Sequence, residues 1–303
     1  MSDKNTSSTK IRKAIIPIAG KGTRFLPATK VIPKEVIPII NIPMIYYVVK
    51  EAVDAGLDQI IFVTSRGKNA VAEFFDRHHE LEYYLEKKGD EKNLRLIRGL
   101  SELTQIITVS QKEQLGLGHA ILQAEELIDQ GERFAVLLGD DIILHSTPAI
   151  KQMMDVSDQH QGASVIGVME VAPDEVHKYG IVGGDFINPE KTTMKMNQMV
   201  EKPTKEKAPS CLATPGRYVL NSHVFSYLNK IKKGNGGEYQ LTDAIDLMIK
   251  EHPFYAHCFK GERFDTGHPL GYLEAVVDFA LKDPFYRTEM LSIIKNKLEK
   301  YGL

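Results

Sequence analysis

Short apolar runs alternate along the chain with segments in which apolar residues recur every three or four positions. Such runs are typical of strands buried on both faces of a sheet, and the intervening segments are typical of the helices that cover those faces. In the first half we expect strands at Ala14–Ile18, Gln59–Thr64, Ile106–Ser110 and Phe134–Leu138, and helices at Met44–Ala55, Asn69–Phe75, Leu81–Lys88 and His119–Leu127. This alternation predicts an α/β fold with a mainly parallel sheet.

In the second half the expected strands are shorter and are separated by turns rich in proline and glycine. They are Ala163–Val168, Gly180–Val182, Met194–Val200, Tyr218–Leu220 and Phe254–Phe259. Helices are expected at His223–Ile231, at Leu241–Lys250 and over Leu270–Leu298, where Pro284 divides the segment into two helices.

The composition of the chain limits the kinds of molecule that the protein is expected to bind. Lys and Arg number 38 against 40 Asp and Glu, so bulk charge favours no nucleic acid. The two cysteines, Cys211 and Cys258, form no motif, which is typical of a reducing compartment. No apolar stretch approaches the roughly 18 residues needed to span a bilayer. We therefore expect a cytoplasmic protein that binds neither membrane nor nucleic acid.

A glycine-rich segment, Ala19–Arg24, follows directly on the first expected strand. In open α/β sheets, ligands bind beyond the carboxyl ends of the strands, and glycines there let backbone N–H groups approach a phosphate closely. Arg24 and Lys34 add two positive charges to the same long loop. The segment by itself predicts an anion site at the edge of the sheet.

Three other interpretations of glycine-rich segments fit less well. A dinucleotide fingerprint requires a third small residue where Phe25 stands. A Walker phosphate loop requires Ser or Thr after Gly67-Lys68, where the chain has Asn69. A surface turn would explain the glycines, but not two prolines and two cations in one loop after a core strand.

The stretch AGKGTRFLPATKVIPKEVIPI closely resembles the G-x-G-T-R…P-K motif of the sugar-nucleotide pyrophosphorylases. The form with PATK before PKE is similar to the bacterial branch that uses UTP and glucose 1-phosphate. Four later segments agree in order, and the resemblance extends from Ile11 to about Leu281. It implies a Rossmann-like, mostly parallel mixed sheet flanked by helices, the GT-A-like fold of nucleotide-diphospho-sugar transferases.

The resemblance implies roles for the loop and for QKEQLGLGHA, which follows a later strand. Arg24 and Lys34 would hold the leaving phosphates, and Gln111 with the backbone of Gly116 would read uracil. The implied nucleotide-binding positions are Ala19, Gly20, Gly22, Thr23, Glu35, Gln111, Gly116 and Gly118. The chain departs from the family pattern at Ile18 and Lys21, close to the triphosphate and the base.

Acidic residues end the Phe134–Leu138 strand, in Leu138-Gly139-Asp140-Asp141. Such pairs are often solvated turns, but carboxylate oxygens at the tip of a central strand also suit Mg²⁺, which takes its other ligands from waters and phosphates. The resemblance makes Asp140 a ligand of Mg²⁺, and Asp265 matches the place of a second carboxylate. Asp140 is thus expected to be both catalytic and metal-binding.

The sugar side is implied by Glu201-Lys202-Pro203, which would otherwise be surface charge. Glu201 would accept hydrogen bonds from glucose hydroxyls, and Lys202 would meet the sugar phosphate as a fourth catalytic residue. Gly180 and Gly216 are the other implied sugar-binding positions. Thr242 and Asp243 suit either a place beside the sugar or ordinary helix capping.

The implied reaction is UTP + α-D-glucose 1-phosphate giving UDP-glucose and diphosphate, by in-line attack of the sugar phosphate on the α-phosphate. A thymidylyltransferase shares the glycine loop, and a silent paralogue would have lost one of the four catalytic residues. We expect one nucleotidyltransferase domain over residues 11–303 after a disordered tail at 1–10. Its parts are a nucleotide-binding half (11–150), a sugar-binding half (151–268) and C-terminal helices (269–303), assembled as a homodimer or homotetramer.

Overall fold

The apolar runs of the first half form neighbouring parallel strands in the computed structural model, which describes residues 10–302. β1 (Lys13–Pro17) pairs in parallel with β4 (Gln59–Thr64) on one side and with β6 (Arg133–Leu137) on the other. β4 pairs in parallel with β5 (Gln105–Ser110) at the edge. The four expected strands of this half are therefore confirmed, and their carboxyl ends meet at one edge of the sheet.

The strands of the second half continue the same sheet but mostly reverse direction. They are β8 (Ser164–Glu170), β9 (Gly180–Phe186), β10 (Thr193–Glu201), β11 (Leu212–Thr214), β12 (Arg217–Asn221) and β13 (Phe254–Cys258). The order of the ten strands is β11-β9-β10-β13-β8-β12-β6-β1-β4-β5.

The expectation of a mostly parallel sheet is wrong. Among the described residues the ten-stranded sheet is mixed: besides the three pairings of the first half only β8 with β13 is parallel, and the other six pairings are antiparallel. Short connections such as the turn between β9 and β10 cannot return a chain to the start of a parallel neighbour, so the strands they join run antiparallel.

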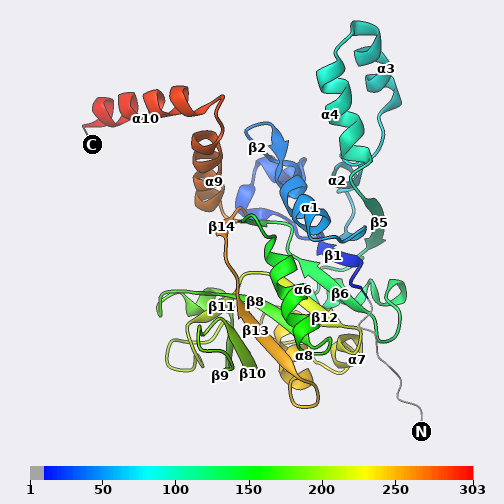
Figure 1. Cartoon of the computed structure of the whole chain (residues 1–303), viewed down its shortest axis with the longest axis vertical. Helices are drawn as coiled ribbons and strands as arrows, with labels where there is room; N and C mark the ends of the chain where they lie inside the picture. Colours follow the sequence, from blue (N-terminus) through cyan, green and yellow to red (C-terminus); the bar gives the residue numbers. More distant parts are fainter. Residues whose placement is uncertain (1–9, 303) are drawn as a thin grey trace.

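Helices cover both faces of the sheet (Figure 1). α1 (Met44–Asp54) and α6 (Ala149–Gln159) pack on one face, where Ala14 and Ile16 of β1 point. The next residue, Ile15, points to the other face and packs with α5 (Leu117–Leu122), α7 (Val224–Leu228) and α8 (Leu241–Met248). The unbroken apolar run of β1 thus reflects burial on both sides.

Several elements were not expected from the sequence, among them the short strand β11 and a ribbon of β2 (Pro38–Ile39) and β3 (Ile42–Pro43). Besides α2 (Asn69–Glu73) and α3 (His79–Lys88), the chain forms α4 (Glu91–Ser101), which pairs with α3 in a hairpin that projects from the body (Figure 1). α6 was also missed. β7 (Asp141–Leu144) and β14 (Glu262–Asp265) form a separate antiparallel ribbon. Asp90 offered a signal for α4, because its side chain caps that helix by accepting the Asn93 N–H at 3.2 Å.

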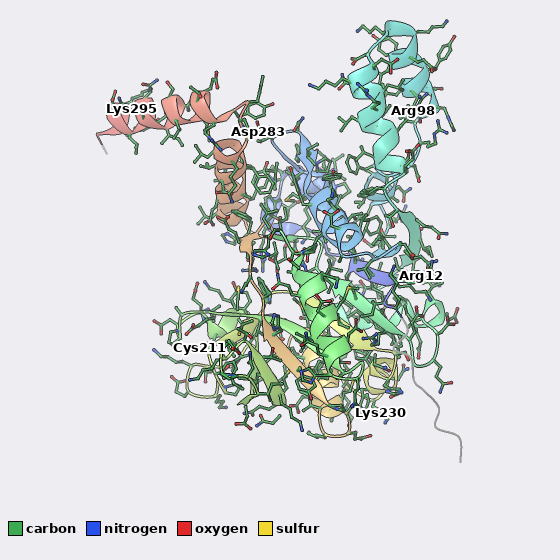
Figure 2. The ribbon with its side chains drawn as sticks, in the orientation of Figure 1. Arg12, Arg98, Cys211, Lys230, Asp283 and Lys295 are labelled. Carbon is green, nitrogen blue, oxygen red and sulfur yellow. The ribbon has the colours of Figure 1, made fainter. Side chains whose placement is uncertain are left out.

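The C-terminal helices divide at Pro284 as expected. α9 (Pro269–Lys282) and α10 (Arg287–Tyr301) meet at a corner marked by Asp283, and α10 extends away from the body (Figure 2). Both cysteines are free, as expected. Within residues 10–302 no helix has the length and apolar character to cross a membrane. The expected tail at 1–10 lies outside the described residues except for Lys10.

A buried ion pair joins the two halves beneath the edge that carries the expected site. Arg217, fully buried on β12, donates to both carboxylate oxygens of Glu51 on α1, at 2.8–3.1 Å, and to the backbone carbonyl of Asp141 at 2.5 Å. Glu51 also accepts the N–H of Ile150 at 3.0 Å. Burial opposes the charge of Arg217, but the Glu51 carboxylate outweighs burial and raises the pKa of the guanidinium.

We predict that Glu51→Gln lowers the free energy of unfolding by about 3–5 kcal/mol, because the buried Arg217 guanidinium loses its hydrogen-bonded carboxylate partner. Asp54→Asn is the matched control, since Asp54 lies on the same helix in an exposed pair with Lys50. That control should change stability by less than about 1 kcal/mol. Urea unfolding of both variants tests this, and equal losses would contradict it.

Candidate active site

The glycine-rich segment forms a tight loop at the carboxyl end of β1. Gly22 has a φ of 65°, and its carbonyl accepts a hydrogen bond from the Thr29 hydroxyl at 2.7 Å. A Cβ on Gly22 would stand 3.2 Å from the Thr29 methyl group, so the loop closes tightly there. Ala19 is tied to the end of β4 because its carbonyl accepts the Ser65 hydroxyl at 3.1 Å.

A cavity of about 310 Å³ lies beside this loop and is lined by many cations. Ala19 and Gly20 line it, which places two of the expected nucleotide-binding residues at its wall. Its cationic lining residues are Lys21, Lys30, Lys34, Arg66 and Lys68. No carboxylate lines this cavity among the described residues, so it is a suitable place for a polyanion.

Glu35 and Lys68 form a buried ion pair beneath the same cavity. The Lys68 ammonium donates to both Glu35 oxygens, at 2.7 and 2.8 Å, and the Glu35 residue is 1% exposed. Burial raises the pKa of Glu35 and lowers the pKa of Lys68. The rejected phosphate-loop motif contains Lys68, and its place shortly after β4 (Gln59–Thr64) is the signal in the sequence that it belongs to this edge.

Asp140 lies just beyond β6 and faces the loop from below. Lys34 forms an ion pair with its Oδ2 atom. Burial would raise the pKa of Asp140, but the Lys34 ammonium outweighs burial and lowers it. The Thr266 hydroxyl donates to the Asp140 carbonyl at 2.8 Å, and the Arg24 guanidinium donates to the Gly267 carbonyl at 3.4 Å.

Asp265 approaches Asp140 across Gly267. A Cβ on Gly267 would stand 2.5 Å from Asp140 Oδ2 and 3.2 Å from Asp265 Oδ1, so both carboxylates face the same small space. No group of three or more His, Cys, Asp or Glu side chains suited to a metal occurs within residues 10–302. Two carboxylates nevertheless suit Mg²⁺, which keeps waters and takes further ligands from phosphates.

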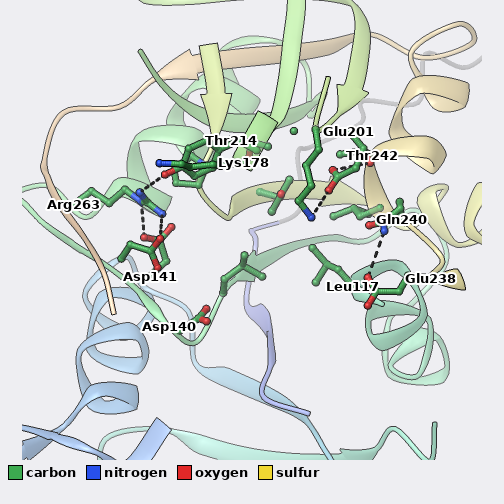
Figure 3. Close-up of a pocket in the computed structure, with 18 residues that line it drawn as sticks. Leu117, Asp140, Asp141, Lys178, Glu201, Thr214, Glu238, Gln240, Thr242 and Arg263 are labelled. Carbon is green, nitrogen blue, oxygen red and sulfur yellow. Dashed lines mark hydrogen bonds and ion pairs between the residues drawn. The ribbon is translucent and has the colours of Figure 1, made fainter. Parts of the chain in front are cut away.

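A second cavity, of about 280 Å³, extends from Asp140 into the second half of the chain (Figure 3). Lys202 and Glu201 line it and form an ion pair at 3.0 Å, and the Thr242 hydroxyl donates to Glu201 at 3.1 Å. Gly180 also lines it, and a Cβ there would stand 2.9 Å from the Thr242 methyl group. Thr242 therefore lies beside the cavity wall.

On the opposite wall, Asp141 and Arg263 form a pair that the sequence did not predict (Figure 3). Arg263 donates to Asp141 Oδ1 at 2.7 Å and to the Tyr179 hydroxyl at 3.3 Å. Burial raises the pKa of Asp141 to about 7, against the lowering effect of Arg263 and Arg217, and its Oδ2 atom has no hydrogen-bond partner. The available signal was the position of Arg263, two residues before Asp265.

The expected base-reading residues do not themselves line either cavity, but their neighbours Leu117 and Gln114 line the second cavity and the cationic cavity, respectively. Gln111 is buried at the end of β5, where its amide donates to the Gly116 carbonyl at 3.2 Å. Gly118 donates its N–H to the Tyr239 carbonyl at 2.9 Å. Gly216, the fourth expected sugar residue, has a φ of 126° and packs against Leu138, where a Cβ would stand 2.5 Å from Cγ.

The chain that forms this sheet edge is similar to known proteins. The nucleotidyl transferase family model matches residues 13–281, and the chain belongs to that family. The UTP–glucose-1-phosphate uridylyltransferase of Staphylococcus haemolyticus is 49% identical over 285 residues, which cover 94% of this chain and 98% of the relative.

Solved structures agree with this likeness. A UDP-glucose pyrophosphorylase complexed with UDP-glucose is 39% identical, with a TM-score of 0.82 over 90% of this chain and 100% of that one. A UTP-bound enzyme of the same kind from Acinetobacter baumannii is also 39% identical, with a TM-score of 0.83 over 94% of this chain and 99% of that one.

We predict that Lys68→Met destabilises the protein by about 3–5 kcal/mol near neutral pH, because Glu35 is left as an unpaired buried carboxylate. Burial raises the pKa of Glu35 and Lys68 opposes that rise, so removal of Lys68 raises this pKa further. The deficit should be smallest at low pH, where Glu35 is protonated in both proteins, and should grow as pH rises through the pKa of Glu35 in the wild type.

Urea unfolding between pH 4 and pH 8 measures that trend. Glu35→Gln/Lys68→Met should regain most of the lost stability, and Lys30→Met, at an exposed lysine of the same cavity, should change little. A deficit that shrinks as pH rises would contradict the assignment.

Proposed function

We propose that this protein transfers a uridylyl group from UTP to α-D-glucose 1-phosphate, giving UDP-glucose and diphosphate. The observation that carries the proposal is the meeting of Lys34 and Asp140 between two cavities, one lined by cations and one lined by Glu201 and Lys202. The names of the similar enzymes, and the UTP and UDP-glucose bound in the solved relatives, support this pair of substrates.

In this proposal the triphosphate lies over the glycine loop. Ala19, Gly20, Gly22 and Thr23 bring backbone near the phosphates, and Arg24 and Lys34 hold the leaving β- and γ-phosphates. Glu35 acts from beneath by holding Lys68 in place. Two unit charges about 4 Å apart repel by about 4 kcal/mol at an effective dielectric of 20, so several cations are needed when two phosphorylated substrates meet.

The sugar phosphate occupies the second cavity. Lys202 meets its phosphate, Glu201 accepts hydrogen bonds from glucose hydroxyls, and Gly180 leaves room that a side chain would fill. Gly216 acts indirectly, because its contact with Leu138 supports the segment that ends in Asp140. A sugar-phosphate oxygen forms the new bond to the α-phosphorus in line with the leaving oxygen, whose bond to that phosphorus breaks to release diphosphate.

A phosphate oxygen is already a competent nucleophile, so no side chain needs to remove a proton. Asp140, and with it Asp265, would hold Mg²⁺, because their carboxylates face one space and are of the type this ion binds. The ion would neutralise charge on the reacting phosphates. In this arrangement Lys34 and Lys202 place further positive charges on opposite sides of the reacting phosphorus.

The base-reading assignment is part of the same proposal. Gln111 with the backbone of Gly116 would contact uracil, and Gly118 would open the following helix.

We further propose that residues 11–303 act as one domain with a nucleotide-binding half and a sugar-binding half. The same proposal includes a homodimer or homotetramer working in the cytoplasm.

We predict that diphosphate release is fastest with UTP and glucose 1-phosphate in a matrix of nucleoside triphosphates and sugar 1-phosphates. The test is kcat/KM for each pair with Mg²⁺ present. Faster release with dTTP than with UTP would replace the uridylyl assignment with a thymidylyl one.

Asp140→Asn should lower kcat roughly a thousandfold, because loss of the metal removes several kcal/mol of charge stabilisation in the transition state. Circular dichroism should show that the variant keeps the wild-type fold, although its melting temperature should fall because Lys34 loses its counter-charge. Asp185→Asn, at an exposed aspartate of β9, is the matched control and should keep full activity. Wild-type turnover by Asp140→Asn at saturating Mg²⁺ would refute the metal assignment.

A further inference from the structure

Lys34 spans the boundary between the two cavities. It follows Pro33 at the start of a short 3-10 turn, Lys34–Val36, and it lines the cationic cavity. Its ammonium nevertheless pairs with Asp140, which lines the sugar-side cavity. Both side chains are largely covered, with exposed fractions of 17% and 27%. Lys34 therefore lines the cationic cavity, but its ammonium group pairs with a carboxylate that lies outside that cavity.

The oxygen that Lys34 holds is the one that faces Asp265. The point where a Cβ on Gly267 would stand is 2.5 Å from Asp140 Oδ2, 3.1 Å from Asp140 Cγ and 3.2 Å from Asp265 Oδ1. Asp140 Oδ1 is not among these three nearest atoms, so Oδ2 is the Asp140 oxygen closest to this point. An ion shared by the two aspartates would bind Oδ2, which already carries the ammonium.

We propose that the Lys34 ammonium and a divalent cation compete for Asp140 Oδ2, so that metal binding releases Lys34 into the cationic cavity. This inference rests on the proposed function only for the placement of the metal on Asp140. A divalent cation and an ammonium on one oxygen repel each other strongly, and this repulsion favours exchange over sharing.

The neighbouring charges determine what Lys34 meets after release. Both oxygens of Glu35 are already held by Lys68, and within residues 10–302 Asp140 is the only carboxylate that pairs with Lys34. A released Lys34 therefore gains a counter-charge only from an anion in the cationic cavity. Metal and polyphosphate consequently favour each other's binding, and this coupling is reciprocal.

The competition is tested by Mn²⁺ binding to the full chain without nucleotide, measured by electron paramagnetic resonance of the free ion. Lys34→Gln should bind Mn²⁺ roughly tenfold more tightly than the wild type, because the competing ammonium is gone. Arg24→Gln is the matched control, since Arg24 also acts on Asp140 through its charge but donates to Gly267 instead. It should tighten Mn²⁺ binding far less.

Unchanged or weaker Mn²⁺ binding by Lys34→Gln would overturn the competition. If Arg24→Gln tightened Mn²⁺ binding as much as Lys34→Gln does, the effect would be a general one of charge, and the competition would again be overturned. Asp140→Asn separates the two proposals. If it binds Mn²⁺ like the wild type, the metal placement fails and the competition fails with it. If it loses Mn²⁺ while Lys34→Gln matches the wild type, only the competition fails.

A second measurement follows Lys34 in the wild-type chain, so its outcome does not depend on the metal affinity of a variant. Lysine labelled with ¹³C at Cε gives a Lys34 signal that is assigned by its loss in Lys34→Gln or Lys34→Met. Titration with Mg²⁺ alone should shift this signal in step with metal binding. A Lys34 signal that stays in place at saturating Mg²⁺ would overturn the inference.

Discussion

The fully buried ion pair between Arg217 and Glu51 is the interaction on which the geometry of the site depends. It joins β12 of the second half to α1 of the first, and the same guanidinium holds the backbone carbonyl of Asp141. The residue before that carbonyl is Asp140, which lines one cavity and pairs with Lys34 of the other. Because a buried charge without its partner is so costly, this pair leaves little freedom in how the two halves meet at Asp140.

Within the site itself, each of four cations forms an ion pair with a carboxylate. Lys34 holds Asp140, Lys68 holds Glu35, Lys202 holds Glu201 and Arg263 holds Asp141. Of the four cations only Lys202 is more than half exposed, whereas the side chains of Lys34, Lys68 and Arg263 are 9–17% exposed. We assign Lys34 and Lys202 to phosphates, and the other two pairs support the walls around them. Anionic substrates would thus replace carboxylates as partners of cations that are already in position.

Local patterns in the sequence predicted most of the elements. Apolar runs such as that of β1 fit a strand buried on both faces, and Pro284 fits the corner between α9 and α10. The sheet was expected to be mostly parallel because strand direction depends on connections that a periodic pattern does not encode. α4 buries only Leu94, and its clearest signal is the Asp90 cap. α6 was missed although Ile150, Met153, Met154 and Val156 recur at helical spacing.

The sequence by itself determined the kinds of residue at the site and their order: a glycine loop with Arg24 and Lys34, then Asp140, then Glu201-Lys202. Residue type and its place after a strand are local properties, so they can be read along the chain. The tertiary structure alone decided which charges meet. Lys34 pairs with Asp140, which is 106 residues away, and Lys68 pairs with Glu35, which is 33 residues away. These residues meet only because β1, β4 and β6 run parallel, which brings the carboxyl ends of the three strands together.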